Sequence, residues 1–491
     1  MKLQRLGIGR PRVALGGVAR SVVLVGGAAA IGQGALVLAS PILARLYSPE
    51  AFGLLSVYAA ALGVLLAVSS LRFDLAIPIA SDADEAVHLL ALSVLVALGS
   101  SVILALLILA WGTQLASIVG ASELAPFLWL LPLALFVASV AQALSSWAVY
   151  HRTFPALGRM RAIQGIAQAT CQVVLGVLRA GPIGLIFGDV AGRLVGAEQL
   201  VRPLMATLRS THFEFGTMRR RARERWGFAR VMTVASLLNA LSLQVPFLLI
   251  PVFFDLESSG LYYLAYRVLV LPASLVAVGV SQVFFGEALL RRGDPQRLHD
   301  LALNAAISLL VFAIPTYTMV TVGGSDMIEL LFGSQWTSAG LYAQILAPSL
   351  ILWSVASPIS ALLLVGRRER ESLAFTAAEL LLKAGSLLVG AAAQSLVVGI
   401  VALSASTILI NIGALWRILR VASASVQDLV RPAARIFSFT LPSAAAVLLV
   451  RSMSMPLVGV VAVAGAGWAV SFVLAARFSP ELRALVSGSR D

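Results

Sequence analysis

The sequence predicts an all-α membrane protein that crosses the bilayer about fourteen times. Of its 491 residues, 59% are apolar and only 12% are charged, whereas soluble proteins average about half apolar and a quarter charged. A membrane-spanning helix takes about 20 mostly apolar residues, so fourteen helices would use about 280 residues, close to the apolar content of the chain. These proportions exclude a soluble enzyme with one anchor, and they leave few residues for a large domain outside the membrane.

Long apolar stretches recur along the whole chain and are separated by short polar segments. Stretches of this length are typical of membrane-spanning helices. The first one, after Arg20, is too long and too rich in glycine for the core of a signal peptide, so we expect it to be retained as a helix. The predicted spans are 21–46, 52–80, 89–111, 125–150, 162–178, 182–201, 231–253, 260–290, 301–322, 339–365, 373–388, 396–416, 436–450 and 457–476.

Basic residues predict the orientation of these spans. The chain holds 36 lysines and arginines against 23 acidic residues, and nearly all the basic ones fall in the two terminal segments and in every second loop. Such residues collect on the cytosolic side of membranes, so both termini are predicted to be cytosolic. The densest run surrounds Arg221, where we expect a solvated linker that faces anionic lipid. The excess charge therefore reports topology, and no nucleic-acid partner is predicted.

The chain offers little for a metal or a cofactor. Cys171 is the only cysteine, and the four histidines lie far apart in sequence. No phosphate-binding loop with a lysine occurs in the sequence. We therefore predict no disulfide, no metal site and no cofactor.

Short matches between the two halves predict an internal repeat. In the clearest match, Gly53 corresponds to Gly260, 207 residues later. Glu50 and Leu54 also have identical residues 207 positions later. Six predicted spans per repeat give both copies the same orientation, so an axis along the membrane normal should relate them around a central cavity. The predicted parts are an N-lobe (1–201), a basic cytosolic linker (202–230), a C-lobe (231–416) and a C-terminal segment with spans thirteen and fourteen (417–491).

Four segments resemble a known family. They are "ARLYSPEAFGLLSVY" (44–58), "LRFDLAIPIASDADEAVHLLALS" (71–93), "SGLYYLAYRVLVLPASLVAVGVSQVFFGEA" (259–288) and "LFGSQWTSAGLYAQILAPS" (331–349). Together they resemble the bacterial polysaccharide-repeat flippases, the O-antigen and exopolysaccharide branch of the multidrug, oligosaccharidyl-lipid and polysaccharide exporter superfamily. The similarity extends over predicted spans one to twelve.

This resemblance implies a transporter with two lobes around a V-shaped cavity. It would flip undecaprenyl-diphosphate-linked oligosaccharide repeat units from the cytosolic to the periplasmic leaflet by alternating access, for polysaccharide or lipopolysaccharide biosynthesis. Its place would be the bacterial inner membrane, with membrane lipid, a polysaccharide polymerase and chain-length machinery as partners. Two alternatives stay open. One is a cation-coupled multidrug or small-molecule exporter of the same superfamily, and the other is a membrane glycan polymerase or ligase, against which the short predicted external loops argue.

Arg267 is the first candidate for contact with the diphosphate, because it lies inside predicted span eight with no acidic residue three or four positions away. A charge at this depth is costly unless it meets water or a partner. Water in a central cavity would satisfy it. An ion pair between helices is the alternative, and the resemblance, which places a cavity-facing arginine on this helix, favours the cavity.

Two further charged pairs are candidates for substrate contact. Arg72 and Asp74 lie near the cytosolic end of predicted span two, where a spacing of two would place them on different sides of a helix, so that they do not easily pair with each other. Contact with substrate and a role as an interfacial cap or brace between the lobes are both open for them. Glu379 and Lys383 have the spacing of a helical ion pair, either as a brace or as a contact for sugar or a coupling proton.

Neutral polar residues and aromatic residues complete the candidate set. Gln33, Gln244, Asn239 and Gln282 fall inside predicted spans and could hydrogen-bond either to sugar or to other helices. The tyrosines at 262, 263 and 266 lie near a predicted boundary, where interfacial anchoring is expected and sugar stacking is the alternative. Asp189 and Arg193 are predicted to form a structural pair near the cytosolic end of span six.

Overall fold

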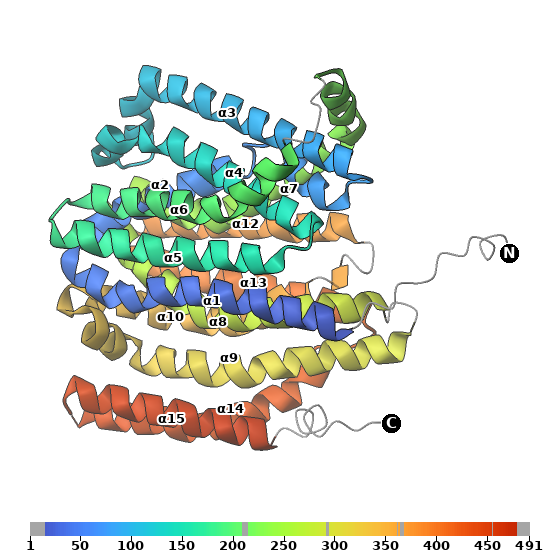
Figure 1. Ribbon diagram of the computed structural model, residues 1–491. Helices are drawn as coiled ribbons and strands as arrows, with labels where there is room; N and C mark the ends of the chain where they lie inside the picture. Colours follow the sequence, from blue (N-terminus) through green and yellow to red (C-terminus); the bar gives the residue numbers. More distant parts are fainter. Residues whose placement is uncertain are drawn as a thin grey trace.

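The computed structural model describes residues 15–208, 215–290, 294–360, 362–363, 368–453 and 455–478, and helices account for nearly all of them (Figure 1). The predicted all-α fold is confirmed. Three short 3-10 helices, η1 (Phe73–Ile79), η2 (Ser122–Phe127) and η3 (Ser334–Trp336), accompany the α-helices. The α-helices are α1 (Leu15–Leu46), α2 (Pro49–Leu66), α3 (Ala83–Ile118), α4 (Leu130–Tyr150), α5 (Phe154–Val177), α6 (Pro182–Leu208), α7 (Phe215–Phe253), α8 (Leu256–Leu290), α9 (Pro295–Phe332), α10 (Thr337–Ile359), α12 (Glu369–Ala392), α13 (Leu396–Val421), α14 (Gln427–Ser452) and α15 (Leu457–Phe478).

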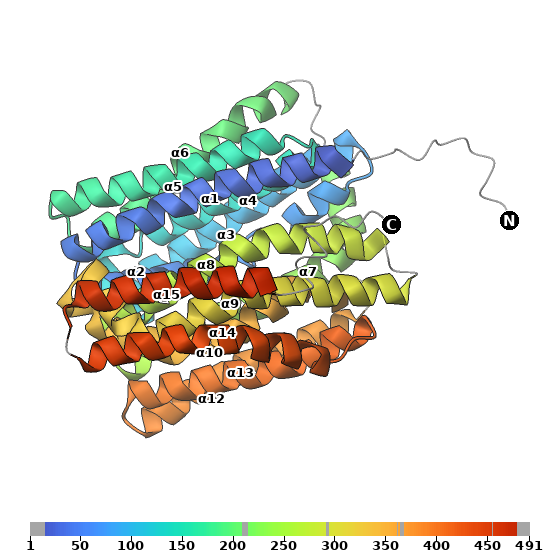
Figure 2. The same cartoon turned by 90° about the horizontal axis from the view of Figure 1, so that it is seen from below.

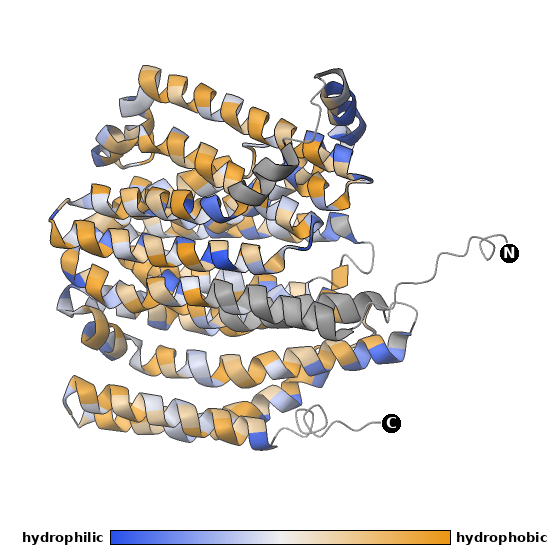
Figure 3. Cartoon of the chain, in the orientation of Figure 1, coloured by the Kyte–Doolittle hydropathy of each residue, from blue (hydrophilic) through white to orange (hydrophobic). Residues whose placement is uncertain are grey.

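The helices form one bundle, and the start of α1 and the end of α15, the described termini, lie at the same side of it (Figure 1). Within the described residues, ten helices are long and apolar enough to cross a membrane. The other four, α1, α5, α6 and α8, are 24 to 35 residues long and run alongside them (Figure 2). Large apolar side chains such as Leu38, Leu109 and Val458 are exposed, and apolar residues predominate along the helices at the outside of the bundle (Figure 3). Because lipid covers such surfaces, the chain is a multi-pass membrane protein.

The second helix is shorter than predicted. Its span was expected over 52–80, but α2 ends at Leu66. Leu71 and Arg72 adopt positive φ angles of 48° and 57°, a left-handed conformation that no α-helix continues through. The chain then turns into η1 before α3 begins at Ala83. The side chain of Asp82 caps α3 by accepting a 2.7 Å hydrogen bond from the amide of Glu85.

The predicted solvated linker is wrong in part, because residues 216–230 form the first turns of α7 and pack against the protein. We call these residues the docked segment. Ala229 is buried in a cluster with Phe73 and Trp147, against which Phe228 also packs. Figure 3 shows this hydrophilic stretch at the side of the bundle that holds the termini. The docked segment therefore attaches the second half of the chain to the first.

Helices α2 and α8 cross in direct backbone contact at the side of the bundle away from the termini (Figure 1). A Cβ atom on Gly53 would overlap the carbonyl oxygen of Leu256, and one on Gly260 would overlap that of Pro49. The hydroxyls of Ser56 and Ser259 lie 2.8 Å apart in the same crossing. This crossing joins the two predicted repeats.

Glycines also bring α5 and α6 together. The glycines of α6 recur every four residues and face a row of glutamines with the same spacing on α5. One of these glutamines, Gln172, is fully buried and donates a 2.8 Å hydrogen bond to the carbonyl oxygen of Leu185. The facing pairs are Gly188 with Gln172, Gly192 with Gln168, and Gly196 with Gln164.

Candidate functional site

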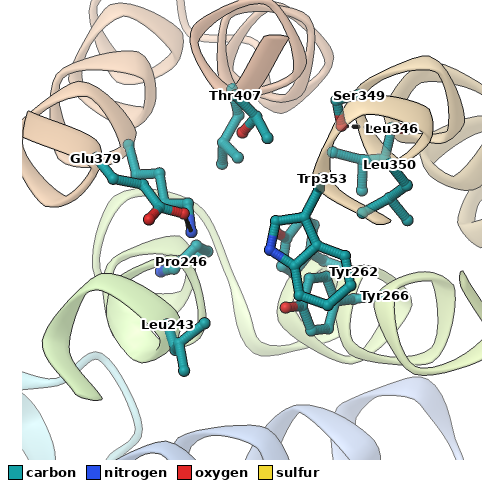
Figure 4. A pocket seen from close by; sticks show the side chains of 12 residues that line it. Leu243, Pro246, Tyr262, Tyr266, Leu346, Ser349, Leu350, Trp353, Glu379 and Thr407 are labelled. Carbon is teal, nitrogen blue, oxygen red and sulfur yellow. Dashed lines mark hydrogen bonds and ion pairs between the residues drawn. The ribbon is translucent and has the colours of Figure 1, made fainter. Parts of the chain in front are cut away.

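A pocket lies among α7, α8, α10, α12 and α13, in the second half of the chain (Figure 4). In this conformation it is narrow, with a cavity volume of about 30 Å³, and it is partly open to the outside. Its wall combines aromatic rings, two hydroxyls and one ion pair. The lining residues are Leu243, Pro246, Tyr262, Tyr266, Leu346, Ser349, Leu350, Trp353, Glu379, Lys383, Leu403 and Thr407.

Glu379 and Lys383 supply the charge of this pocket. The Nζ atom of Lys383 lies 2.7 Å from Oε1 of Glu379, which agrees with the i, i+4 pairing predicted from the sequence. The same ammonium donates a 3.1 Å hydrogen bond to the carbonyl oxygen of Ser242, so it also ties α12 to α7. Lys383 is nearly buried, whereas a quarter of the Glu379 side chain stays accessible. The pair is thus close to neutral and keeps carboxylate surface available to the pocket.

Aromatic rings form the opposite wall. Tyr262 and Tyr266 stack with ring centroids 6.2 Å apart, and Phe247 packs 5.3 Å from each of them. Figure 4 shows Trp353 reaching into the same space from α10. Interfacial anchoring does not explain Tyr262, because it is only 1% exposed. The sequence analysis did not single out Trp353, because one tryptophan in an apolar helix has no distinguishing spacing.

Arg267 faces away from this pocket. Its Nη2 atom donates a 3.3 Å hydrogen bond to the carbonyl oxygen of Leu36 in α1. That oxygen also accepts a 2.7 Å hydrogen bond from the hydroxyl of Ser40. The guanidinium therefore lies half-buried between α1 and α8. Helix α8 thus presents Arg267 toward α1 and presents Tyr262 and Tyr266 toward the pocket.

Arg72 and Asp74 do pair, contrary to the expectation from a continuous helix. Their charged atoms lie 3.9 Å apart, because the left-handed turn at Arg72 brings the two side chains together. Asp74 is fully buried and accepts hydrogen bonds of 2.5 Å from Ser70 and 2.8 Å from Gln142. This geometry makes Asp74 a brace between η1 and α4. Its predicted contact with substrate stays a prediction.

The neutral candidates are spread over three helices. Gln33 of α1 and Asn239 of α7 are exposed, and Gln244 packs against Gly63 of α2. Gln282 belongs to α8, but its side chain lies outside the described part of the structure. The side chain of Gln244 thus lies at the contact between α2 and α7.

Asp189 and Arg193 form a two-point ion pair with N to O distances of 2.9 and 3.1 Å. Both lie in the first half of α6 (Pro182–Leu208), because this helix continues beyond the predicted end of span six. Arg193 is also close enough to Tyr58 and Tyr263 for electrostatic interaction. The pair therefore points toward the helices that cross between the two repeats.

Comparison with known sequences gives consistent matches. A family model described as polysaccharide biosynthesis protein matches residues 42–341. The succinoglycan biosynthesis transport protein ExoT of Rhizobium meliloti (strain 1021) is 26% identical over 309 residues, which cover 61% of this chain and 59% of that protein. The lipopolysaccharide biosynthesis protein WzxC of Escherichia coli (strain K12) is 23% identical over 338 residues, 67% of this chain and 65% of that one. The chain thus spans about six-tenths of the length of these relatives.

Solved structures share the fold. The lipid II flippase MurJ, in an inward closed conformation, superposes with a TM-score of 0.61 at 14% identity and covers 94% of this chain and 98% of its own. A multidrug resistance MATE family transporter of the MOP superfamily, in an inward-facing conformation, also gives 0.61 at 16% identity, with 80% and 95% covered. At 14% and 16% sequence identity, these superpositions establish that the chain has the same fold as the two transporters.

Proposed function

This chain belongs to the polysaccharide biosynthesis protein family, and we propose that it flips a lipid-linked oligosaccharide across the bacterial inner membrane. The substrate would be an undecaprenyl-diphosphate-linked repeat unit that moves from the cytosolic to the periplasmic leaflet by alternating access. The product would serve polysaccharide or lipopolysaccharide assembly, with a polymerase and chain-length machinery as partners. The names of the two relatives, one for succinoglycan and one for lipopolysaccharide, support this assignment.

The observation that carries the proposal is the pairing of aromatic rings with a neutralised ion pair in one pocket (Figure 4). A sugar ring has apolar C–H faces and a polar rim of hydroxyls. Aromatic faces such as that of Trp353 can cover the C–H faces of the sugar. The accessible oxygen of Glu379 can accept hydrogen bonds from its hydroxyls. A few convergent polar groups on a mostly apolar wall are the usual composition of a small-molecule site.

Arg267 would meet the charged part of the substrate. Its bond to the Leu36 carbonyl is long, and that oxygen is already shared with Ser40. A diphosphate offers an arginine stronger, charge-assisted and two-point hydrogen bonds. We therefore assign the diphosphate to the α1–α8 side and the glycan to the pocket.

A multidrug exporter for hydrophobic cations fits this pocket less well. A cation would be stabilised by a carboxylate without a partner, but Lys383 neutralises Glu379 at 2.7 Å. Neutral sugar hydroxyls avoid this conflict. The chemistry of the wall thus favours glycan transport over cation efflux.

A complementation assay tests the proposal in a strain that lacks its own repeat-unit flippase. We expect the chain to restore surface polysaccharide and to lower the lipid-linked intermediate in the cytosolic leaflet, and Trp353→Ala to reduce both effects at normal protein abundance. Trp416→Ala, at an exposed position of α13, is the matched control. Failure of the wild-type chain to restore polysaccharide with several donor pathways, together with raised drug resistance, would instead identify an exporter.

A further inference from the structure

The docked segment has two chemically different faces. On the inner face, Nε of Arg225 lies 2.7 Å from Oε1 of Glu85, a side chain that is only 2% exposed. Arg221 lies 3.7 Å from Asp82 and 3.3 Å from Glu224. Together with the buried contacts of Ala229, these pairs fix how the helix is rotated about its own axis.

That fixed rotation presents three further arginines along one side of the helix. Arg219, Arg223, Trp226 and Arg230 follow each other at spacings of four, three and four, which places them within about 60° on a helix. Arg220 is exposed as well but lies outside this line. All four residues of the line are exposed; Trp226 is 47% accessible, and its ring lies near Phe73, with ring centroids 6.3 Å apart. Among the residues that the structure describes, none of these three arginines has an acidic partner. We call these four residues the basic stripe.

The basic stripe rises directly from a membrane-spanning helix. The apolar part of α7 begins at Val231, immediately after Arg230. At a rise of 1.5 Å per residue, Arg223 lies about 10 Å and Arg219 about 16 Å farther along the helix than Arg230. Tryptophan is enriched where lipid headgroups meet hydrocarbon, so Trp226 marks the same level. Long arginine side chains can extend back along the helix toward that level.

We propose that the basic stripe binds the phosphate headgroups of anionic phospholipids. Three exposed positive charges with no described acidic partner attract a negative surface, and their attachment to a membrane helix keeps them beside it. Glu224, the acid of the docked segment, is engaged with Arg221. The stripe continues directly into a membrane-spanning helix and combines arginines with a tryptophan, so the membrane surface is the partner that fits all four residues. This inference does not depend on the transported substrate.

Native mass spectrometry of the detergent-purified full chain tests this proposal. The probes are dioleoyl phosphatidylglycerol and dioleoyl phosphatidylcholine, added at equal concentrations. We expect the wild type to retain more phosphatidylglycerol, and the triple variant R219Q/R223Q/R230Q to lose at least a few-fold of that preference. The matched control is R152Q/R159Q/R161Q, which removes three exposed arginines elsewhere in the same chain. It should lose less of the preference than the stripe variant, because its arginines do not form one line with a tryptophan.

Two further measurements sharpen the outcome. Single variants should weaken phosphatidylglycerol retention in the order R230Q, R223Q, R219Q, because headgroup contact falls with distance from Val231. High salt should reduce the preference by screening. Undiminished retention in a folded triple variant, or an equal loss in the control, would overturn the proposal. If the triple variant does not fold, the R230Q variant alone serves as the test: reduced phosphatidylglycerol retention supports the proposal, and undiminished retention overturns it. Loss of an acidic protein partner with normal lipid retention would also overturn it.

Discussion

Gly53 and Gly260 occupy equivalent positions in the two sequence repeats, and in the structure each lies against the backbone that precedes the other. Gly53 contacts the carbonyl of Leu256, and Gly260 contacts the carbonyl of Pro49. The offset of 207 residues that pairs the two glycines also pairs Pro49 with Leu256. The contact is therefore symmetric, as expected if the repeats are related by a two-fold axis. Any conformation that opens this side of the bundle must separate α2 from α8 here.

A methyl group at either glycine should hold this crossing apart. We expect Gly53→Ala or Gly260→Ala to cost about 1 to 3 kcal/mol in the conformation described here, because the new Cβ overlaps a backbone oxygen. Disulfide formation in a Ser56→Cys, Ser259→Cys double variant without Cys171 measures the contact, since the parent hydroxyls lie 2.8 Å apart. Gly34→Ala is the control, because nothing lies within 4 Å of its added Cβ. Equal cross-linking in all variants would contradict this expectation.

Removal of the guanidinium at Arg267 should affect transport more than folding. We expect Arg267→Ala to accumulate nearly as well as the wild type, since it loses one long hydrogen bond to Leu36, and to deliver little glycan to the periplasm. Arg267→Lys should restore part of the activity, because lysine keeps the charge but not the planar two-point donor. Surface polysaccharide and the cytosolic-leaflet intermediate are the measured quantities. An abundant Ala variant with full activity would show that the charge is dispensable.

The Glu379 and Lys383 pair should tolerate joint removal better than single removal. Glu379→Gln leaves a nearly buried ammonium with the Ser242 carbonyl as its partner, at a cost of roughly 3 kcal/mol. The double change to Gln and Met removes both charges, so protein abundance and melting temperature should recover. If the double variant folds but exports no glycan, the pair takes part in transport beyond its role as a brace.

Asp74 should matter for stability more than its exposed counterparts. Asp74→Ala leaves the buried donors of Ser70 and Gln142 without their acceptor, so we expect a loss of roughly 3 kcal/mol and a lower melting temperature. Asp300→Ala, at an exposed position, provides the comparison. Normal melting of the Asp74 variant together with lost transport would favour the contact with substrate that the sequence suggested.

Reporter insertions can test the orientation of the bundle. Gly216 is the first residue of the docked segment, and Gly333 is the half-buried residue at which α9 ends. We expect a cytosolic signal at Gly216 and a periplasmic signal at Gly333, because basic residues gather on the first side. An insertion within α9 itself, for example at Gly324, would disturb the fold, because Gly324 lies inside the helix and packs against Gly340. Signals from the same side would contradict the predicted topology.

The all-α fold and its series of membrane-spanning helices could be predicted from hydropathy, because each apolar stretch must satisfy its backbone groups within a helix. The end of α2 could not, since "LRFDLA" continues the apolar pattern and only the backbone at Arg72 shows the turn. The pairing of Arg72 with Asp74 was missed for the same reason.

The candidate site was predictable only where one helix contains both partners. Glu379 with Lys383 and Asp189 with Arg193 follow from a spacing of four. Trp353 and the pocket faces of Tyr262 and Tyr266 depend on how α8, α10 and α12 pack, and sequence spacing carries no information on that packing. The charge of Arg225 was visible, but its partner Glu85 lies 140 positions earlier.

The close packing of α5 on α6 limits which sequences can occupy these two helices. Gly188, Gly192 and Gly196 leave no room for a side chain between them and the facing glutamines. A side chain at one of these glycines would therefore have to push α5 and α6 apart, because the nearest atoms include backbone atoms of α5 that remain whatever residue replaces a glutamine. Across natural variants we expect these three positions to change far less often than the exposed residues of the same helix.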